Sequence, residues 1–115
     1  MRAALWSTCL LLSACSRGDG APTGSRERGR VLFQQHCTLC HGARADGRGE
    51  RAFAFTRPPA DFTSVTWRTG TSVARVLLVL REGVRGTAMS AWPSLRSDEM
   101  NDLAAYVLSV AGDGP

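Results

Sequence analysis

The sequence predicts an all-α domain in which three to five helices pack around one covalently bound prosthetic group. Apolar residues recur at helical spacing in three segments, and no segment alternates apolar and polar residues as a half-buried strand would. Two cysteines and a histidine stand together in one short run, at Cys37, Cys40 and His41. The chain has 115 residues, which is enough for one small domain with a modest core of its own.

Residues 1–14 have the pattern of an export signal. Arg2 supplies a positive charge, residues 3–12 are mostly apolar, and small residues precede Cys15. The run resembles a bacterial lipoprotein signal peptide with a Leu-Ser-Ala-Cys lipobox, so Cys15 is the expected site of lipid attachment; a plain secretory signal is the alternative. The apolar stretch is shorter than the roughly 20 residues of a membrane-spanning helix. Residues 15–25 are rich in Gly, Pro and Ser and predict a flexible tether.

The first predicted helix, residues 27–36, leads directly into Cys37-Thr38-Leu39-Cys40-His41. This C-x-x-C-H run is the attachment signature of a c-type haem. Residues three apart share one helix face, so the thiols of Cys37 and Cys40 can reach two vinyl groups on one haem edge. His41 then supplies the proximal iron ligand.

Three other interpretations of this run are weaker. A structural zinc site needs four ligands, and the chain has no second cluster, because the only other histidine, His36, adjoins the same run. A thioredoxin-like dithiol would need a βαβ pattern around it, and a structural disulfide would leave His41 without a role. Cys9 and Cys15 belong to the export region. Export also agrees with thioether attachment, which takes place outside the cytoplasm.

An irregular stretch and a second helix follow the run. Residues 42–71 contain several glycines and prolines, and such a long loop is explained if it wraps a haem edge. Residues 72–82 predict a helix that starts at Ser72 and stops at Gly83. Its apolar residues at helical spacing are Val73, Val76, Leu77 and Leu80.

The last helix has the clearest pattern. Ser97 can cap it, and Asp98 and Glu99 suit its positive end. It should end near Ala111, which leaves residues 112–115 as a tail. Its apolar stripe consists of Leu103, Ala104, Val107 and Leu108.

The charge of the chain names no partner by itself. All fourteen basic residues are arginine against ten acids, a formal charge of +4. Loss of Arg2 with the signal peptide and addition of two haem propionates would bring the charge to about +1. No dense basic stripe is interleaved with aromatics, so nucleic acid is not an expected partner. A local ring of arginines could still steer a redox protein.

Residues 26–111 resemble a monohaem class I cytochrome c of bacterial type. The resemblance implies that the first and last helices cross closely, with Gly29 of the first against Tyr106 of the last, and with Phe33 and Leu103 alongside. It rests on Gly29, Phe33, the run 37–42, the run Gly86-Thr87-Ala88-Met89-Ser90-Ala91-Trp92, Leu103 and Tyr106.

Met89 is the expected second axial ligand. It lies in a loop 48 residues after His41, from which the chain can reach the other haem face. Met100 has core spacing on the last helix, and His36 lies on the proximal side. The family usually has proline directly after the ligand methionine, whereas this chain has Ser90. His/Met ligation implies a moderately high reduction potential and no open site for a substrate.

The resemblance also implies partners for the imidazole and the propionates. A proline carbonyl should accept the free N–H of the proximal imidazole, with Pro58 as the candidate and Pro59 as the fallback. Propionate donors are expected from Trp67 and Arg68, with Arg57 also available. Trp92 could cover the haem or pack in the core.

These observations predict a one-electron carrier, not an enzyme, that shuttles electrons between periplasmic or membrane redox partners through brief encounters. It would lie on the periplasmic side of a bacterial membrane, lipid-anchored at Cys15, or be soluble in the periplasm. Two alternatives are a haem-based sensor whose methionine ligand is displaced, and a fixed cytochrome subunit of a dehydrogenase or terminal oxidase. A free carrier should be a monomer.

Overall fold

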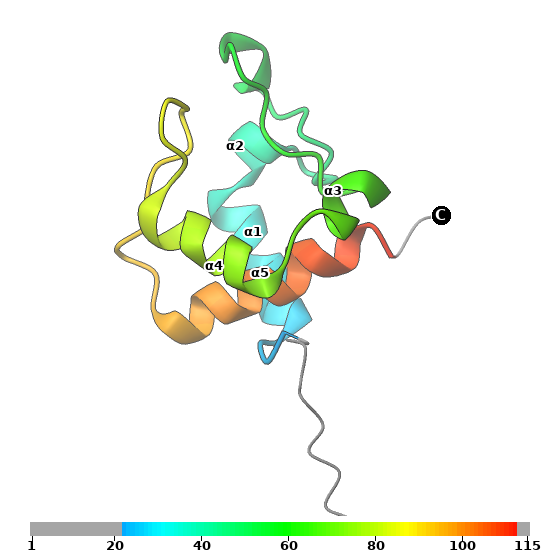
Figure 1. The fold of residues 1–115 in the computed structure, drawn as a ribbon, viewed down its shortest axis with the longest axis vertical. Coiled ribbons are helices and arrows are strands. Elements are labelled where there is room, and N and C mark those ends of the chain that lie inside the picture. Colours follow the sequence, from blue (N-terminus) through cyan, green and yellow to red (C-terminus); the bar gives the residue numbers. More distant parts are fainter. Residues whose placement is uncertain (1–21, 113–115) are drawn as a thin grey trace, which may run out of the picture.

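The computed structural model describes residues 22–112, and within that range all regular structure is helical, as predicted (Figure 1). Five α-helices and one 3-10 helix follow one another in this range, in agreement with the predicted three to five helices. None of them is long and apolar enough to cross a membrane. In chain order they are α1 (Arg26–His36), α2 (Thr38–His41), η1 (Ala52–Ala54), α3 (Val65–Thr69), α4 (Val73–Glu82) and α5 (Ser97–Val110).

Helices α1 and α5 cross at close range, which confirms the predicted contact. A Cβ atom at Gly29 would lie 1.9 Å from the carbonyl oxygen of Asp102 and 2.9 Å from Cβ of Tyr106. Only glycine permits this approach. The Phe33 ring lies 5.2 Å from the Tyr106 ring, and Leu103 is buried beside them.

A buried carboxylate ties the start of α1 to α5. Asp102 accepts hydrogen bonds from the backbone N–H of Ser25 and from Nε of Arg28, the latter at 2.8 Å. The Arg28 guanidinium, together with that N–H, holds the pKa of Asp102 below its usual range. Gly24 also packs on α5, since a Cβ there would meet the carbonyl oxygen of Asn101 at 2.2 Å.

The predicted tether, residues 15–25, extends into the folded domain. The structure places Gly24 and Ser25 in the folded domain, where Ser25 caps α1 by accepting the N–H of Arg28. The predicted signal peptide and Cys15 lie outside the described residues, as does part of the predicted tail.

Helix α4 has the predicted ends, whereas α5 begins differently. Ser72 caps α4 by accepting the N–H of Arg75, and Gly83 ends it with a φ of 73°. The expectation that Ser97 caps α5 is wrong by one residue, because Ser97 is already helical. The Glu99 side chain instead accepts the backbone N–H of Arg96 at 2.9 Å. The C-terminal cap is Ala111, as expected.

The stretch 42–71 is less irregular than predicted, because η1 and α3 form within it. Ser64 starts α3 by accepting the N–H of Trp67, a side-chain cap that five residues of weak periodicity did not reveal. The loop is fixed to the rest of the fold at Phe62, whose N–H donates to the carbonyl of Ala45 at 2.9 Å. Both residues are buried.

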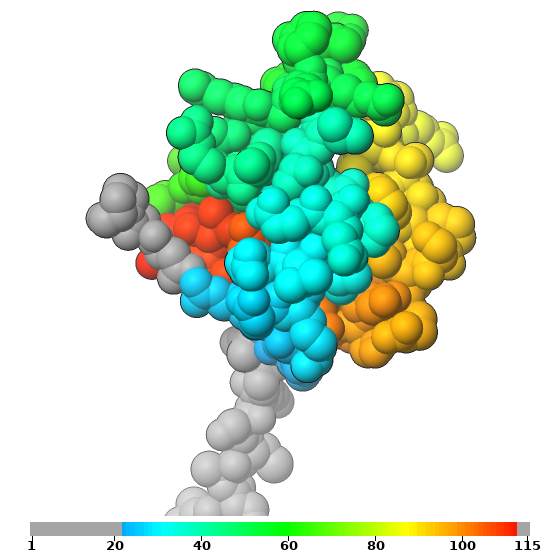
Figure 2. Space-filling model, turned by 180° about the vertical axis from the view of Figure 1, so that it is seen from behind, coloured from blue at the N-terminus to red at the C-terminus, as the bar shows by residue number. Residues whose placement is uncertain are grey.

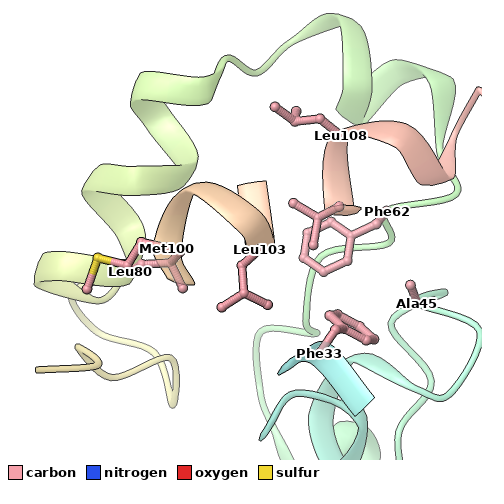
Figure 3. Close-up of a cluster of buried hydrophobic side chains, with 8 residues drawn as sticks. Phe33, Ala45, Phe62, Leu80, Met100, Leu103 and Leu108 are labelled. Atoms are coloured by element: carbon pink, nitrogen blue, oxygen red, sulfur yellow. The ribbon is translucent and has the colours of Figure 1, made fainter. Parts of the chain in front are cut away.

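The hydrophobic core lies between α1, α4, α5 and this loop (Figure 3). Phe33 is 1% exposed and its ring lies 6.0 Å from the Phe62 ring. Met100 is buried on α5, which confirms its core position. The cluster consists of Phe33, Ala45, Phe62, Leu80, Met100, Leu103, Val107 and Leu108.

Candidate functional site

A cavity of about 540 Å³ opens beside this core, within the usual size range of cofactor sites. Segments far apart in the sequence line it: the end of α1 with α2, residues 55–62, α4, and residues 84–92. Cys37, Cys40, His41 and Met89 all face this one cavity. The fold thus brings together two thiols, an imidazole and a thioether from opposite halves of the chain.

One turn of helix arranges the C-x-x-C-H run. The N–H of His41 donates to the carbonyl of Cys37 at 2.9 Å, and Gly42 donates to that of Thr38 at the same distance. Gly42 has a φ of 83°, and a Cβ there would meet Oδ1 of Asp46 at 2.5 Å. Burial, with a smaller contribution from Cys40, raises the pKa of the Cys37 thiol to about 12. The unreacted thiol is therefore protonated at neutral pH.

The orientation of the His41 ring is set from two sides. Its Nδ1 lies 3.1 Å from the carbonyl oxygen of Ala60, and its ring stacks on Phe62 with centroids 4.7 Å apart. A carbonyl oxygen can only accept, so Nδ1 carries the proton and Nε2 keeps a free lone pair. Burial lowers the pKa of His41 although the Ala60 hydrogen bond opposes it, which favours the neutral imidazole that binds metals.

The expected proline acceptor is wrong. The carbonyl that receives the His41 N–H belongs to Ala60, the residue after the Pro58-Pro59 pair. Pro58 and Pro59 line the cavity instead. Two consecutive prolines fix their own φ angles and stiffen the approach to Ala60, so they act one step before the residue that makes the hydrogen bond.

Hydrogen bonds close the segment that carries Met89. The Met89 N–H donates to Oγ1 of Thr87 at 3.2 Å, and the Thr87 hydroxyl donates to the carbonyl of Val84 at 2.7 Å. The Val84 N–H in turn donates to the carbonyl of Met89 at 2.8 Å. Trp92 donates its N–H to the carbonyl of Leu80 at the end of α4. The thioether is thus presented by a closed loop although Ser90 replaces the usual proline.

The predicted propionate donors are only partly brought to the cavity. Trp67 lines it, with its ring edge-on to Phe62 at 4.6 Å. Arg68 does not, because its Nε donates to the carbonyl of Leu108 at the end of α5, 2.8 Å away, so its expected role is wrong. Arg57 and Arg75 line the cavity.

Sequence reasoning missed Arg75 although a signal was present. Arg75 lies four residues before Val79, and both line the cavity, so they share one face of α4. The apolar stripe of α4 reaches the same cavity through Val76 and Leu80, so the position of Arg75 directly before Val76 was the available signal. Trp92, left open between two roles, lines the cavity with His36, and their ring centroids are 5.7 Å apart.

The side chains of the site fit a covalently held haem and do not fit a structural zinc ion. Within residues 22–112 no three His, Cys, Asp or Glu side chains gather as a metal site. The cavity instead offers paired thiols on one turn, a neutral imidazole with a free Nε2, and largely apolar walls. That donor set is the one that c-type haem requires.

Known proteins agree with this geometry. Residues 24–107 match the protein family described as cytochrome C oxidase, cbb3-type, subunit III. A chain of the reducing HAO-like protein complex Kustc0457/Kustc0458 from Kuenenia stuttgartiensis shares the fold, with a TM-score of 0.66 and 19% identity over 77% of this chain and 44% of that one. This chain therefore spans less than half the length of that relative. The KustC0563 c-type cytochrome is 26% identical, with a TM-score of 0.53 over 73% of this chain and 94% of that one.

Proposed function

We propose that His41 and Met89 are the axial ligands of the haem in this chain, which belongs to the cytochrome c family described as cytochrome C oxidase, cbb3-type, subunit III. The family establishes a covalently bound haem c, consistent with Cys37 and Cys40, and haem-based one-electron transfer by a carrier that is not itself an enzyme. The bound haem supplies the one-electron iron couple. The assignment of both ligands is the step that this proposal adds.

The observation that carries the proposal is the shared cavity. His41 and Met89 come from segments 48 residues apart, yet both side chains line it. The imidazole is held neutral with Nε2 free, and the thioether is the soft neutral donor that stabilises Fe(II). With both axial positions filled, no site remains for a substrate, which suits an electron carrier.

A matched pair of variants tests the ligand. Met89→Leu should abolish the weak absorption band at about 695 nm that marks Fe(III)–Met ligation. The reduced form of this variant should bind carbon monoxide. Met100→Leu, which changes a buried methionine of α5, should keep the band and exclude carbon monoxide. If the unmodified protein itself lacks the band and binds carbon monoxide, the ligand assignment fails and the sensor function takes its place.

The proposal includes export and lipid attachment at Cys15. The support is the signal pattern of residues 1–14 together with the direction of α1, which runs from its N-cap Ser25 towards its C-cap Cys37. An anchor before Ser25 would attach the membrane at one end of α1, whereas Cys37 lies at the other end, so the haem-binding thiols would stay away from the membrane. Mass spectrometry of the purified protein should find a lipid-modified Cys15 at the N-terminus. An unmodified N-terminus would favour plain secretion into the periplasm.

Two kinds of partnership are compatible with one-electron transfer. A free carrier meets its donor and acceptor briefly, whereas a subunit stays bound to a larger redox complex. The family description and the complex that contains the first structural relative give weight to the subunit form. Size-exclusion chromatography of mildly solubilised membranes, followed by the haem absorption, distinguishes a monomer from a complex.

A further inference from the structure

Residues 48–57 form a projection beside the cavity, which we call the arginine knob. It contains η1, the green turn that stands out at the top of both whole-molecule views (Figures 1 and 2). Phe53 lies in this turn and is 90% exposed, the largest exposed fraction among the large apolar side chains of the described residues. In the isolated domain this phenylalanine gains almost nothing from hydrophobic burial, so its ring is available to a partner.

The arginine knob is fixed to the turn that carries the haem-binding thiols. The Gly49 N–H donates to the carbonyl of Cys40 at 3.2 Å, and the Arg51 N–H donates to that of Leu39 at 2.9 Å. A Cβ at Gly49 would lie 2.3 Å from the Leu39 carbonyl oxygen, so the two backbones touch. Leu39 itself is 52% exposed. Two exposed apolar side chains therefore stand on one rigid unit next to the attachment site.

The other end of the arginine knob reaches the cavity. Phe55 and Arg57 line the main cavity, and residues 54–57 face residues 86–88, next to Met89, across a smaller hollow. The knob thus lies between the thiol-bearing turn and the methionine loop. A protein that docks on it comes close to the edge through which an electron enters or leaves.

The charge of the arginine knob is not neutralised within the described residues. Arg48 and Arg51 have no ion pair or side-chain hydrogen bond there, and together with Arg57, which faces the cavity, the arginines of the knob outnumber its single acid, Glu50. By contrast, four arginines elsewhere pair with carboxylates of the same chain: Arg28, Arg30, Arg44 and Arg96. The arginine knob therefore carries a net positive charge that its own chain leaves unpaired.

We propose that the arginine knob is the docking surface for a redox protein with an acidic surface. Phe53 enters an apolar hollow of the partner, and the free arginines pair with the carboxylates that surround it. Unpaired arginines accelerate the encounter, whereas one buried aromatic anchor gives short-lived binding. One electron passes between the two metal centres, and no bond is made or broken.

An anionic membrane also attracts arginine side chains, but the fold favours a protein partner. The chain enters the domain at Gly24 and Ser25. These residues and Cys37 lie at opposite ends of the 11-residue helix α1, which is about 16 Å long. A lipid anchor before Ser25 draws that end of the domain, and not the arginine knob, towards the bilayer. The proposal rests on one-electron transfer, which the visible spectrum and reduction potential of each variant test separately.

The first experiment compares two charge-reversal variants of the haem-loaded protein. The substitutions R48E/R51E and R26E/R30E change the net charge equally, on the knob and on α1. Stopped-flow electron transfer with an acidic blue-copper protein should slow about tenfold in R48E/R51E at low salt and converge with the unmodified protein at high salt. R26E/R30E should slow much less. Equal slowing in the two variants would mean that only net charge matters, and the docking surface would be rejected.

The second experiment tests the apolar anchor. Phe53→Ser should lower the same rate constant several-fold at every salt concentration, whereas Val31→Ser, at an exposed position of α1, should leave it unchanged. A rate constant unchanged by Phe53→Ser would reject the aromatic anchor.

The membrane is tested on the whole exported holoprotein, in which Phe53→Cys supplies a thiol for a nitroxide label. On phosphatidylglycerol vesicles the label should remain accessible to water-soluble relaxation agents. Immersion of the label in the lipid would overturn the proposal and assign the arginine knob to the bilayer.

Discussion

Replacement of Gly29 by alanine should destabilise the domain, although alanine is the better helix former. Gly29 lies inside α1, where α1 crosses α5. The added Cβ would lie 1.9 Å from the carbonyl oxygen of Asp102, a backbone atom that cannot rotate away, and 2.9 Å from Cβ of Tyr106. Real Cβ contacts essentially never fall below 3.0 Å, so the two helices must separate by about 1 Å or more.

Two opposing effects decide the magnitude. Alanine gains about 1 kcal/mol over glycine in helix propensity. Overpacking typically costs about 1–3 kcal/mol, and separation of α1 from α5 also weakens the contacts of Phe33 with Tyr106. The steric effect should prevail, because the overlap falls on backbone. We expect a net loss of about 1 kcal/mol, or roughly 4–8 °C in Tm for a domain of this size.

Thermal unfolding of the haem-loaded protein, followed by circular dichroism at helical wavelengths, measures the effect. The control is Gly112→Ala, because a Cβ there would have no neighbour closer than 3.4 Å, an ordinary contact. The control should stay within about 0.5 kcal/mol of the unmodified protein. A Gly29→Ala protein as stable as the unmodified one, or more stable, would refute the close crossing, since only the propensity gain would remain.

Three further predictions concern the cavity and its support. Thr87→Val removes the hydroxyl that accepts the Met89 N–H, so the added imidazole concentration that displaces the methionine ligand should fall several-fold. Thr87→Ser keeps a hydroxyl and should behave as the unmodified protein. Equal displacement in the two variants would show that Thr87 does not position the ligand. The pKa of Asp102 in the folded protein lies below its unfolded value of about 3.9, so its contribution to stability is complete above that pH and disappears as the pH falls through the folded pKa. Asp102→Asn should therefore lose less of its Tm than the unmodified protein when thermal melts are repeated at acidic pH. An unchanged dependence of Tm on pH would contradict this. Arg75→Gln removes a positive charge from the cavity wall and should lower the reduction potential of the haem, whereas Arg68→Gln, outside the cavity, should not. Potentiometric titration of the two variants measures this. Equal shifts would reject Arg75 as a neighbour of the propionates.

Local patterns in the sequence predicted much of the fold. The apolar spacing of α4 and α5 and the stop at Gly83 needed no knowledge of distant residues, because helix period and terminal glycine are properties of short segments. The cap of α5 was misplaced by one residue, since Glu99, reaching back to Arg96, competes with Ser97 for the same role. The short helix α3 could not be predicted, because five residues are too few to show a helical period.

The attachment chemistry was determined by the sequence itself. Cys37, Cys40 and His41 lie within one turn, and a single helical turn suffices to place both thiols and the imidazole on one cavity wall. The match to a cytochrome c family confirms that prediction. The assignment of Met89 stays a prediction, although its side chain lines the same cavity.

Only the tertiary structure decided which residues support that chemistry. The carbonyl of Ala60 replaces that of Pro58, and Arg75 lines the cavity where Arg68 was expected. The path of the long loop places Ala60 and directs Arg68 away from the cavity, and it depends on long-range contacts such as the hydrogen bond from Phe62 to Ala45. The packing of α4 places Arg75. A one-residue shift along a loop or a 100° step around a helix moves a side chain from the cavity to solvent. Residue type and spacing determine what can bind the haem, whereas packing between distant segments determines which neighbour faces it.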